Sequence, residues 1–339
     1  MVQHKSEQIV GLDCLRFLAA MLVAMFHLSY WAWHFPEGET AAAMVRATYF
    51  PNLGPWFSGG WSGVQIFFVI SGFVIAYTAD QKSAFVFLKS RILRLYPATW
   101  VCATITLFFV IATSLYPPGE IAEHYVRGMT LWPFGPWIDH VYWTLRVELS
   151  FYGLVFLLLL FDRFRHFEQV MTVVGCLSSA FCIAVLTYTH GQQKPLFSSV
   201  GELLLLSHGD CFALGSMMWL SAKTGLTARR AVVCVICCAG VISYTTTRDG
   251  AVNGTVYFLS AMCWMVASIC YNDVFRPDTR PHRRAFHSLA RSHHVPDLFA
   301  PGYRRSGDDA LACELWPSAG LHCADDCAGS GDRRIHRGG

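Results

Sequence analysis

Charged residues are scarce in this chain of 339 residues: Asp, Glu, Lys and Arg make up only 14% of it, and hydrophobic residues make up 54%. A soluble globular domain usually carries about 25% charged residues. The deficit excludes a disordered protein, a coiled coil and an ordinary cytosolic enzyme, and it predicts an integral membrane protein. The formal net charge is only +3, so no strongly basic surface indicates a nucleic acid as partner.

A cysteine framework is lacking as well. The chain has 13 cysteines, but most lie inside apolar runs, as Cys234, Cys237 and Cys238 do. Buried cysteine behaves as a small hydrophobe, so we predict no disulfide or zinc framework there. Other Cys and His residues near the C-terminus follow no standard zinc spacing, and we expect no metal cofactor. These are Cys313, His322, Cys323, Cys327 and His336.

Long apolar runs, in contrast, are abundant. A membrane-spanning helix takes roughly 20 mostly apolar residues, and eight segments reach or approach that length. They are 9–31, 60–79, 98–115, 141–161, 170–189, 199–220, 231–247 and 252–271. They predict an all-α, polytopic integral membrane helix bundle. The first segment contains Asp13 and Arg16 and has no small-residue cleavage site after it, so it is not a cleaved signal peptide.

The basic residues between these segments predict a cytoplasmic N-terminus, because Lys and Arg accumulate on the cytoplasmic side. With that orientation, the cytoplasmic segments carry Lys5, Lys82, Lys89, Arg91, Arg94, Arg163, Arg165, Lys223, Arg229 and Arg230, and the outer loops carry Arg46, Arg127, Lys194 and Arg248. The outer loops at 32–59 and 116–140 are rich in Trp and Pro. Such aromatic residues suit the membrane interface, and they also suit stacking on sugar rings.

Ionisable residues inside the first span are candidates for function, because each costs about 2.5–3.5 kcal/mol to insert. Arg16 and His27 are eleven residues apart, so they share one helix face about 16 Å apart along the axis. Asp13 lies on the same face, three residues before Arg16. The alternative is polar contact between helices, with Arg16 extending to the membrane surface.

Two further segments combine polar and small residues. The run at 60–73 is rich in small residues, which favours close helix packing, and Ser71 in it has no adjacent base, so we do not interpret it as a nucleophile. Arg91 and Arg94 lie three residues apart before Pro97, which we expect to start a new helix. Such a pair can bind phosphate, or it can mark topology and contact anionic lipid headgroups.

Glu148 lies about one turn or more inside the outer end of the fourth span, and a buried carboxylate there must be paired, protonated or functional. Arg146 is not its partner within one helix, since residues two apart do not face each other. The alternative to a functional role is an ion pair with a cation on another helix.

Four motifs occur in order along residues 8–275. They are Arg16 and His27 spaced as Arg-x10-His, the run Gly-Val-Gln-Ile-Phe-Phe-Val-Ile-Ser-Gly-Phe at 63–73, Arg91, Arg94 and Pro97 spaced as Arg-x-x-Arg-x-x-Pro, and Trp-Thr-Leu-Arg-Val-Glu-Leu-Ser-Phe-Tyr at 143–152. A weaker match is Asp-Cys-Phe-Ala-Leu-Gly at 210–215. Together they resemble the acyltransferase-3 family of membrane-bound O-acyltransferases.

The resemblance implies a domain of about ten membrane helices in a bacterial inner membrane. It implies transfer of an acyl group, commonly acetyl, from cytoplasmic acyl-CoA to a hydroxyl of an extracytoplasmic carbohydrate. It also assigns roles to residues. Arg91 and Arg94 would bind CoA phosphates, Arg16 would extend that site, His27 would act as general base, and Glu148 would orient His27 or bind the acceptor. Direct transfer is favoured over an acyl-enzyme, since no nucleophile is required.

Two alternatives stay open. A transporter of carbohydrate or lipid intermediates also has polytopic helices with intramembrane charges. The other is an inactive remnant, because composition changes after residue 275: the segment 276–339 is rich in Arg, His and Asp and contains no apolar run long enough to span a bilayer. We therefore divide the chain into a membrane domain at 1–275 and an atypical tail at 276–339. The tail is predicted to be either disordered or the product of a frame-shifted gene end.

Overall fold

The computed structural model describes residues 10–34, 50, 52–189 and 200–271. All of them lie in one compact unit, Met1–Pro277. The atypical tail at 276–339 lies outside the described residues, so the frame-shift hypothesis stays a prediction.

The described chain is a bundle of helices, without strands in these residues. The helices are α1 (Val10–Phe26), a π-helical turn (His27–Trp31), α2 (Ala32–His34), α4 (Gly54–Phe57), a 3-10 turn (Gly60–Ser62), α5 (Gly63–Ala79), α6 (Ala84–Thr113), α7 (Pro118–Thr130), α8 (Tyr142–Leu160), a second 3-10 turn (Phe164–His166), α9 (Phe167–Thr189), α11 (Gly209–Thr224), α12 (Ala228–Thr246) and α13 (Ala251–Tyr271). Seven helical segments in this part of the chain are long and apolar enough to cross a membrane. The predicted all-α, polytopic membrane bundle is confirmed.

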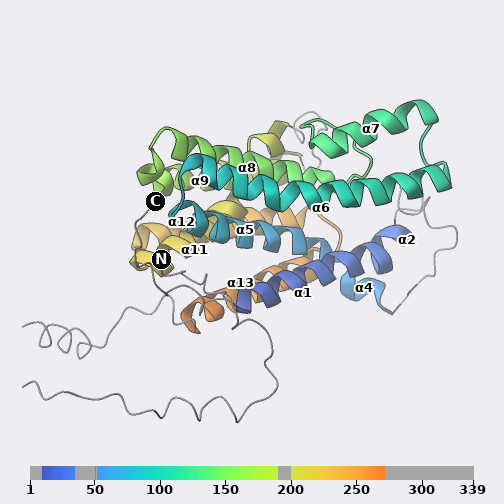
Figure 1. Cartoon of the computed structure of the whole chain (residues 1–339). Coiled ribbons are helices and arrows are strands. Elements are labelled where there is room, and N and C mark those ends of the chain that lie inside the picture. The colour runs from blue at the N-terminus through green and yellow to red at the C-terminus, as the bar shows by residue number, and fades with distance from the viewer. Residues whose placement is uncertain (1–9, 35–49, 51, 190–199, 272–339) are drawn as a thin grey trace, which may run out of the picture. The chain divides into compact units, whose positions relative to one another are not determined.

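The two helices α5 and α11 lie side by side at the centre of this bundle. α11 also packs against α9 and α12, while α1 packs against the other side of α5 and against α13. Figure 1 shows α6, α8 and α9 above this centre and α1 and α13 below it. We call the end where α5 turns into α6 and α11 into α12 the basic end, because Lys223, Arg229 and Arg230 lie there. Which end faces the cytoplasm stays a prediction.

The core depends on glycines where α5 crosses α11. A methyl group on Gly72 would collide with the backbone of Phe212, and one on Gly215 with the backbone of Val69. The Ser216 hydroxyl donates to the Gly72 carbonyl at 3.3 Å. Small residues allow such close backbone approach between membrane helices. The close packing predicted from the 60–73 run is therefore confirmed at Gly72.

The sixth expected span, 199–220, is not one continuous helix. A helical turn at 200–203 is followed by an irregular turn at 204–208, and α11 begins only at Gly209. Leu205 in the turn has a left-handed φ of 59°, and it is buried. Irregular backbone at membrane depth is tolerated where protein surrounds it, which is why hydrophobicity alone did not reveal the break.

The expectation that Pro97 starts a new helix is wrong. α6 continues through Pro97 from Ala84 to Thr113, since neighbouring helices support a membrane helix at a proline. Just beyond Pro97, α6 contacts two other helices. Tyr142 of α8 donates to the Thr99 carbonyl at 3.3 Å, and Trp100 donates to the Met129 carbonyl of α7 at 3.1 Å. One helix thus connects α8 to α7.

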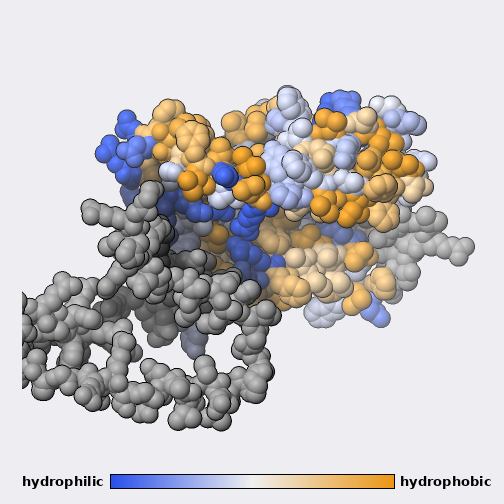
Figure 2. All heavy atoms as spheres, in the orientation of Figure 1, coloured by the Kyte–Doolittle hydropathy of each residue, from blue (hydrophilic) through white to orange (hydrophobic). Residues whose placement is uncertain are grey.

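Apolar side chains cover the outward surface of α6. Ile105, Phe108, Phe109 and Ile111 are all more than half exposed, and Figure 2 shows hydrophobic residues over this part of the molecule. An exposed surface of this kind suits contact with lipid tails. The protein is a multi-pass membrane protein.

Candidate functional site

His27 begins the π-helical turn that continues α1. Its Nδ1 lies 2.8 Å from the Val23 carbonyl oxygen, which only accepts hydrogen bonds, so Nδ1 carries the proton. The Nε2 atom of the neutral ring then keeps a lone pair that accepts a proton. His27 is half-buried. π-helical turns occur frequently at functional sites, and this one fixes both the place and the tautomer of the imidazole.

Arg16 lies on α1, nearer the basic end than His27. Its Nη1 donates to Asp13 Oδ1 at 2.8 Å, and the two side chains are 28% and 54% exposed. The predicted shared face of Asp13 and Arg16 is confirmed. The pair leaves part of the guanidinium open to a ligand.

Glu148 of α8 lies in a polar group formed with α5 and its own helix. One of its carboxylate oxygens accepts hydrogen bonds from the Tyr152 hydroxyl at 2.6 Å and from the Ser71 hydroxyl at 3.3 Å. Tyr152 is buried, whereas Ser71 and Glu148 are half-buried. The second carboxylate oxygen accepts none of these bonds.

Arg91 extends this polar group toward the basic end. It is 4% exposed, its Nη2 donates to the Thr78 hydroxyl, and its guanidinium lies 5.7 Å from the centre of the Tyr152 ring. Glu148 lies within electrostatic reach of it. Arg91 is therefore directed into the bundle.

Arg94 has a different environment from Arg91. It lies one helical turn further along α6, and its side chain is exposed. The two arginines of the Arg-x-x-Arg motif thus differ: one supports the buried polar group, and the other is accessible.

The structure does not bring His27 and Glu148 together. Gly63 of α5 faces Ala19 and Val23 of α1, and Gly60 faces Leu22, so α1 and α5 are antiparallel. Starting from this contact, His27 lies four to eight residues toward one end and Ser71 eight residues toward the other. At 1.5 Å per residue the two are about 18–24 Å apart along the axis.

That distance decides how His27 is oriented. The Val23 carbonyl holds the ring, and among the described residues no hydrogen bond or ion pair joins it to Glu148. The polar group of Glu148 lies instead at about the depth of Arg16.

Some members of the polar group were not singled out from the sequence. Tyr152 was detectable, since it follows Glu148 by four residues and shares its helix face. Thr78 comes from another helix, as does Ser71, which the sequence analysis considered only as a nucleophile. No local spacing indicates their contacts with Arg91 and Glu148. Arg146 pairs with Glu202 and donates to the Pro133 carbonyl at 3.0 Å, so its partner also comes from a distant segment.

Possible ligands of a metal are not clustered in the part of the chain that the structure describes: no three His, Cys, Asp or Glu side chains there are placed to hold one ion. The groups suited to an anionic, phosphate-bearing donor are the accessible guanidinium groups of Arg16 and Arg94.

Comparison with known proteins assigns the family. The sequence model of the acyltransferase-3 family, described as an acyltransferase domain, matches residues 9–290. The chain belongs to this family. No solved structure matches it.

Curated relatives share moderate identity with the chain. The putative membrane-bound transacylase BcsY of Komagataeibacter xylinus is 27% identical over 303 residues, which cover 80% of this chain and 66% of BcsY. The O-acetyltransferase OatA of Staphylococcus aureus is 26% identical over 207 residues, which cover 52% of this chain and 34% of OatA. The acyltransferase MdmB of Streptomyces mycarofaciens is 27% identical over 152 residues, which cover 42% of this chain and 37% of MdmB. The chain thus spans less than two thirds of the length of each.

Proposed function

We propose that this protein transfers an acyl group, specifically acetyl, from cytoplasmic acyl-CoA to a hydroxyl of an extracytoplasmic carbohydrate, and that it does so in a bacterial inner membrane. The observation that carries the proposal is the half-buried His27 ring, whose tautomer leaves Nε2 free to accept a proton. The family and the names of the relatives, transacylase and O-acetyltransferase, support acyl transfer to oxygen.

The donor binds from the basic end. Arg94 is exposed and Arg16 is partly exposed, so both reach the phosphates of CoA with charge-assisted hydrogen bonds. Arg91 is more deeply buried than these two side chains and adds positive charge to the wall of the donor site. Arg16 and His27 are about 16 Å apart along the axis, which suits a donor with phosphates at one end and a thioester at the other.

The chemistry takes place at His27. Nε2 takes the proton from the acceptor hydroxyl, and the hydroxyl oxygen bonds to the thioester carbonyl carbon. The carbon–sulfur bond then breaks and the CoA thiolate leaves. The Nδ1–H group keeps donating its hydrogen bond to the Val23 carbonyl, which holds the ring in position while the ring carries positive charge.

Glu148 contributes from a distance. It holds the Tyr152 and Ser71 hydroxyls, and its charge balances that of Arg91 inside the bundle, where an unpaired charge is costly. It thereby keeps the wall of the donor site in place.

The test is acetyl transfer by protein reconstituted in lipid nanodiscs, with radiolabelled acetyl-CoA and oligosaccharide acceptors. We expect His27→Gln to lose at least 100-fold in rate, as removal of a general base does, with unchanged helix content. The matched control is His124→Gln, at a buried histidine on α7, whose loss leaves the rate unchanged.

Retention of most activity by His27→Gln would remove the general-base role. Movement of a labelled saccharide across the membrane, without acetylation, would instead favour a transporter.

A further inference from the structure

A group of polar and aromatic side chains lies at the end of the bundle opposite the basic end, where α12 turns into α13. Asp249 Oδ2 lies 3.3 Å from His34 Nε2, and these side chains are 59% and 46% exposed. The Asp249 carbonyl accepts the Trp61 indole N–H at 3.0 Å. Asp249 thus connects the end of α1 and α2 to the start of α5, and both its carboxylate and the imidazole of His34 face solvent in part.

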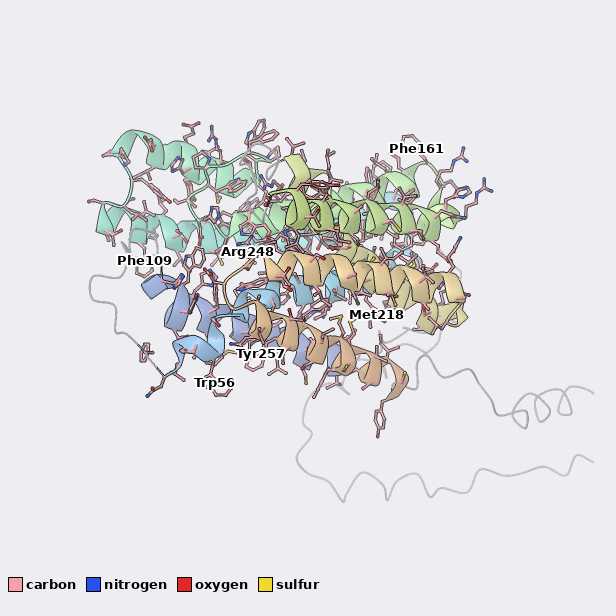
Figure 3. The ribbon with its side chains drawn as sticks, turned by 180° about the vertical axis from the view of Figure 1, so that it is seen from behind. Trp56, Phe109, Phe161, Met218, Arg248 and Tyr257 are labelled. Atoms are coloured by element: carbon pink, nitrogen blue, oxygen red, sulfur yellow. The ribbon has the colours of Figure 1, made fainter. Side chains whose placement is uncertain are left out.

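The neighbouring residue, Arg248, connects this surface to a side chain inside the bundle, that of Tyr244. It is exposed, its guanidinium donates to the Tyr244 hydroxyl, and it lies 5.1 Å from the centre of the Tyr244 ring. Figure 3 shows Arg248 at this end of α12. Tyr244 itself is buried.

Below Tyr244 lies His208, in the irregular turn before α11. Its ring centre is 5.1 Å from that of Tyr244, 5.2 Å from that of Phe68 and 5.3 Å from that of Trp143. His208 is 1% exposed. Its Nε2 has no hydrogen-bond partner among the described residues. A buried ring nitrogen without a protein partner is costly to the fold, so we expect a water molecule or a ligand to supply one.

The backbone that holds His208 is strained. Leu205, three residues before it, has a left-handed φ of 59° and is 5% exposed. Non-glycine residues in this conformation cluster at ligand-binding sites, where the surroundings enforce them. The break in the sixth apolar segment therefore serves to place an imidazole between α5, α8 and α12.

The same group lies beside the proposed reaction centre. His34 follows His27 by seven residues on the helical segment formed by α1, the π-helical turn and α2. Asp249 therefore contacts the far end of the segment that begins at His27. A ligand held by Asp249 and Arg248 would lie close to the imidazole that acts as base.

We propose that His34, Asp249, Arg248, Tyr244 and His208 form the binding site for the acceptor, and that this acceptor is a neutral saccharide with neighbouring free hydroxyls; this rests on the proposed function. Arg248 and Asp249 bind adjacent hydroxyls as donor and acceptor. The ring of Trp143, which is half-buried, packs against the apolar face of a sugar ring, and buried Tyr244 holds Arg248 in place. His208 Nε2 accepts a hydrogen bond from the sugar hydroxyl that reaches furthest into the bundle. Asp249 disfavours a polyanionic glycan.

The experiment measures binding and kinetics with the full chain in nanodiscs. The probes are cellotetraose and tetra-N-acetylchitotetraose, with binding followed by saturation-transfer NMR and transfer from acetyl-CoA followed by radiolabel. The variants are Arg248→Gln and His208→Gln. Their matched controls are Arg127→Gln, an arginine on α7 paired with Glu123, and His124→Gln.

We expect each test variant to weaken saccharide binding and raise the saccharide KM on the order of tenfold, as the loss of one hydrogen bond does. Acetyl-CoA affinity stays unchanged in both, and the controls match the parent in every measurement. Because His208→Gln alters a buried residue, Arg248→Gln at the exposed rim provides a test that does not depend on the core.

Two results would overturn the site: variants whose saccharide affinity equals that of the parent, or a parent that binds neither oligosaccharide while still hydrolysing acetyl-CoA. A parent that binds saccharide through Arg248 and His208 but neither hydrolyses acetyl-CoA nor transfers acetyl would support this site and refute the proposed function. The two proposals therefore fail separately.

Discussion

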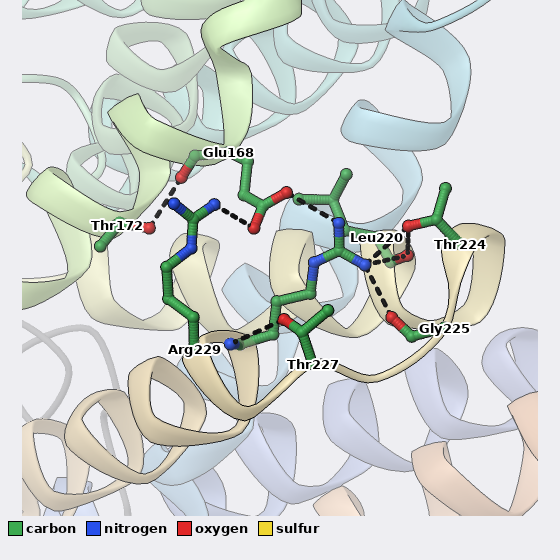
Figure 4. A network of polar contacts seen from close by, with 8 residues as sticks. Glu168, Thr172, Leu220, Thr224, Gly225, Thr227 and Arg229 are labelled. Carbon is green, nitrogen blue, oxygen red and sulfur yellow. Dashed lines mark hydrogen bonds and ion pairs between the residues drawn. The ribbon is translucent and has the colours of Figure 1, made fainter.

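Replacing Glu168 by Gln is expected to destabilise the basic end of the bundle. Glu168 of α9 holds two arginines of α12: Oε2 accepts from Arg230 Nη2 at 2.7 Å, and Oε1 accepts from Arg229. The Arg230 guanidinium also donates to the carbonyls of Leu220 and Gly225 at 3.1 and 2.7 Å. Figure 4 shows how this network ties the C-terminal end of α11 to α9 and α12.

The magnitude follows from burial. Removing one partner of a fully buried ion pair costs about 3–5 kcal/mol. The Arg230 side chain is 9% exposed and that of Glu168 is 19% exposed, and the α11 carbonyls remain bound to Arg230 in the variant. We therefore expect a loss of about 2 kcal/mol in the free energy of unfolding.

The assay is reversible denaturation in a fixed detergent, with Asp80→Asn as the control. Asp80 pairs with Lys223 at 2.6 Å, but that lysine is 44% exposed, so the control should lose less than about 1 kcal/mol. Equal losses in both variants, or a smaller loss in Glu168→Gln, would refute the reasoning from burial.

Three further outcomes are expected. Gly215→Ala should lower the yield of folded protein and its unfolding midpoint, because the new methyl meets the Val69 backbone; an unchanged midpoint in detergent would show that α5 and α11 separate freely. Arg94→Ala should weaken acetyl-CoA binding by about 1.5–3 kcal/mol, the value of a hydrogen bond to a charged group, in equilibrium binding to nanodiscs; unchanged affinity would place CoA elsewhere. Glu202→Gln should destabilise the fold by about 2 kcal/mol, since it removes the partner of the Arg146 side chain, which is only 6% exposed. Glu202→Asp should recover part of that loss in the same denaturation assay.

The sequence predicts the helices well, because a membrane-spanning helix is recognisable from the length of its run of hydrophobic residues. The i, i+3 relation of Asp13 and Arg16 was also accessible, since it depends only on helix geometry. Hydrophobicity failed at 204–208, where the residues around the break are as apolar as a span and the surrounding protein tolerates irregular backbone. The expectation at Pro97, which came from the helix-breaking effect of proline, failed for a related reason, because the neighbours of α6 support the helix there.

The site was only partly predictable. His27 and Glu148 each stood out as costly groups in apolar segments, but their separation depends on how α1 and α5 align, which no local pattern encodes. The partners of Glu148 and Arg146 come from segments far along the chain. The contacts of His208 were not predicted, because it lies in a short polar run, Ser207 to Asp210, inside a segment that otherwise resembles an ordinary span.

The glycine crossing of α5 and α11 also changes what the family motifs mean for a newly sequenced chain. The run at 63–73 contains Gly72, whose missing side chain is what lets the two central helices touch. That run therefore indicates the architecture of the helix bundle. It does so whether or not the chain that contains it still catalyses a reaction. Under the proposed function, His27 is the residue that indicates reactivity, because its imidazole is the proposed base. Screening a genome for active members should accordingly weigh the single histidine above the longer glycine motif.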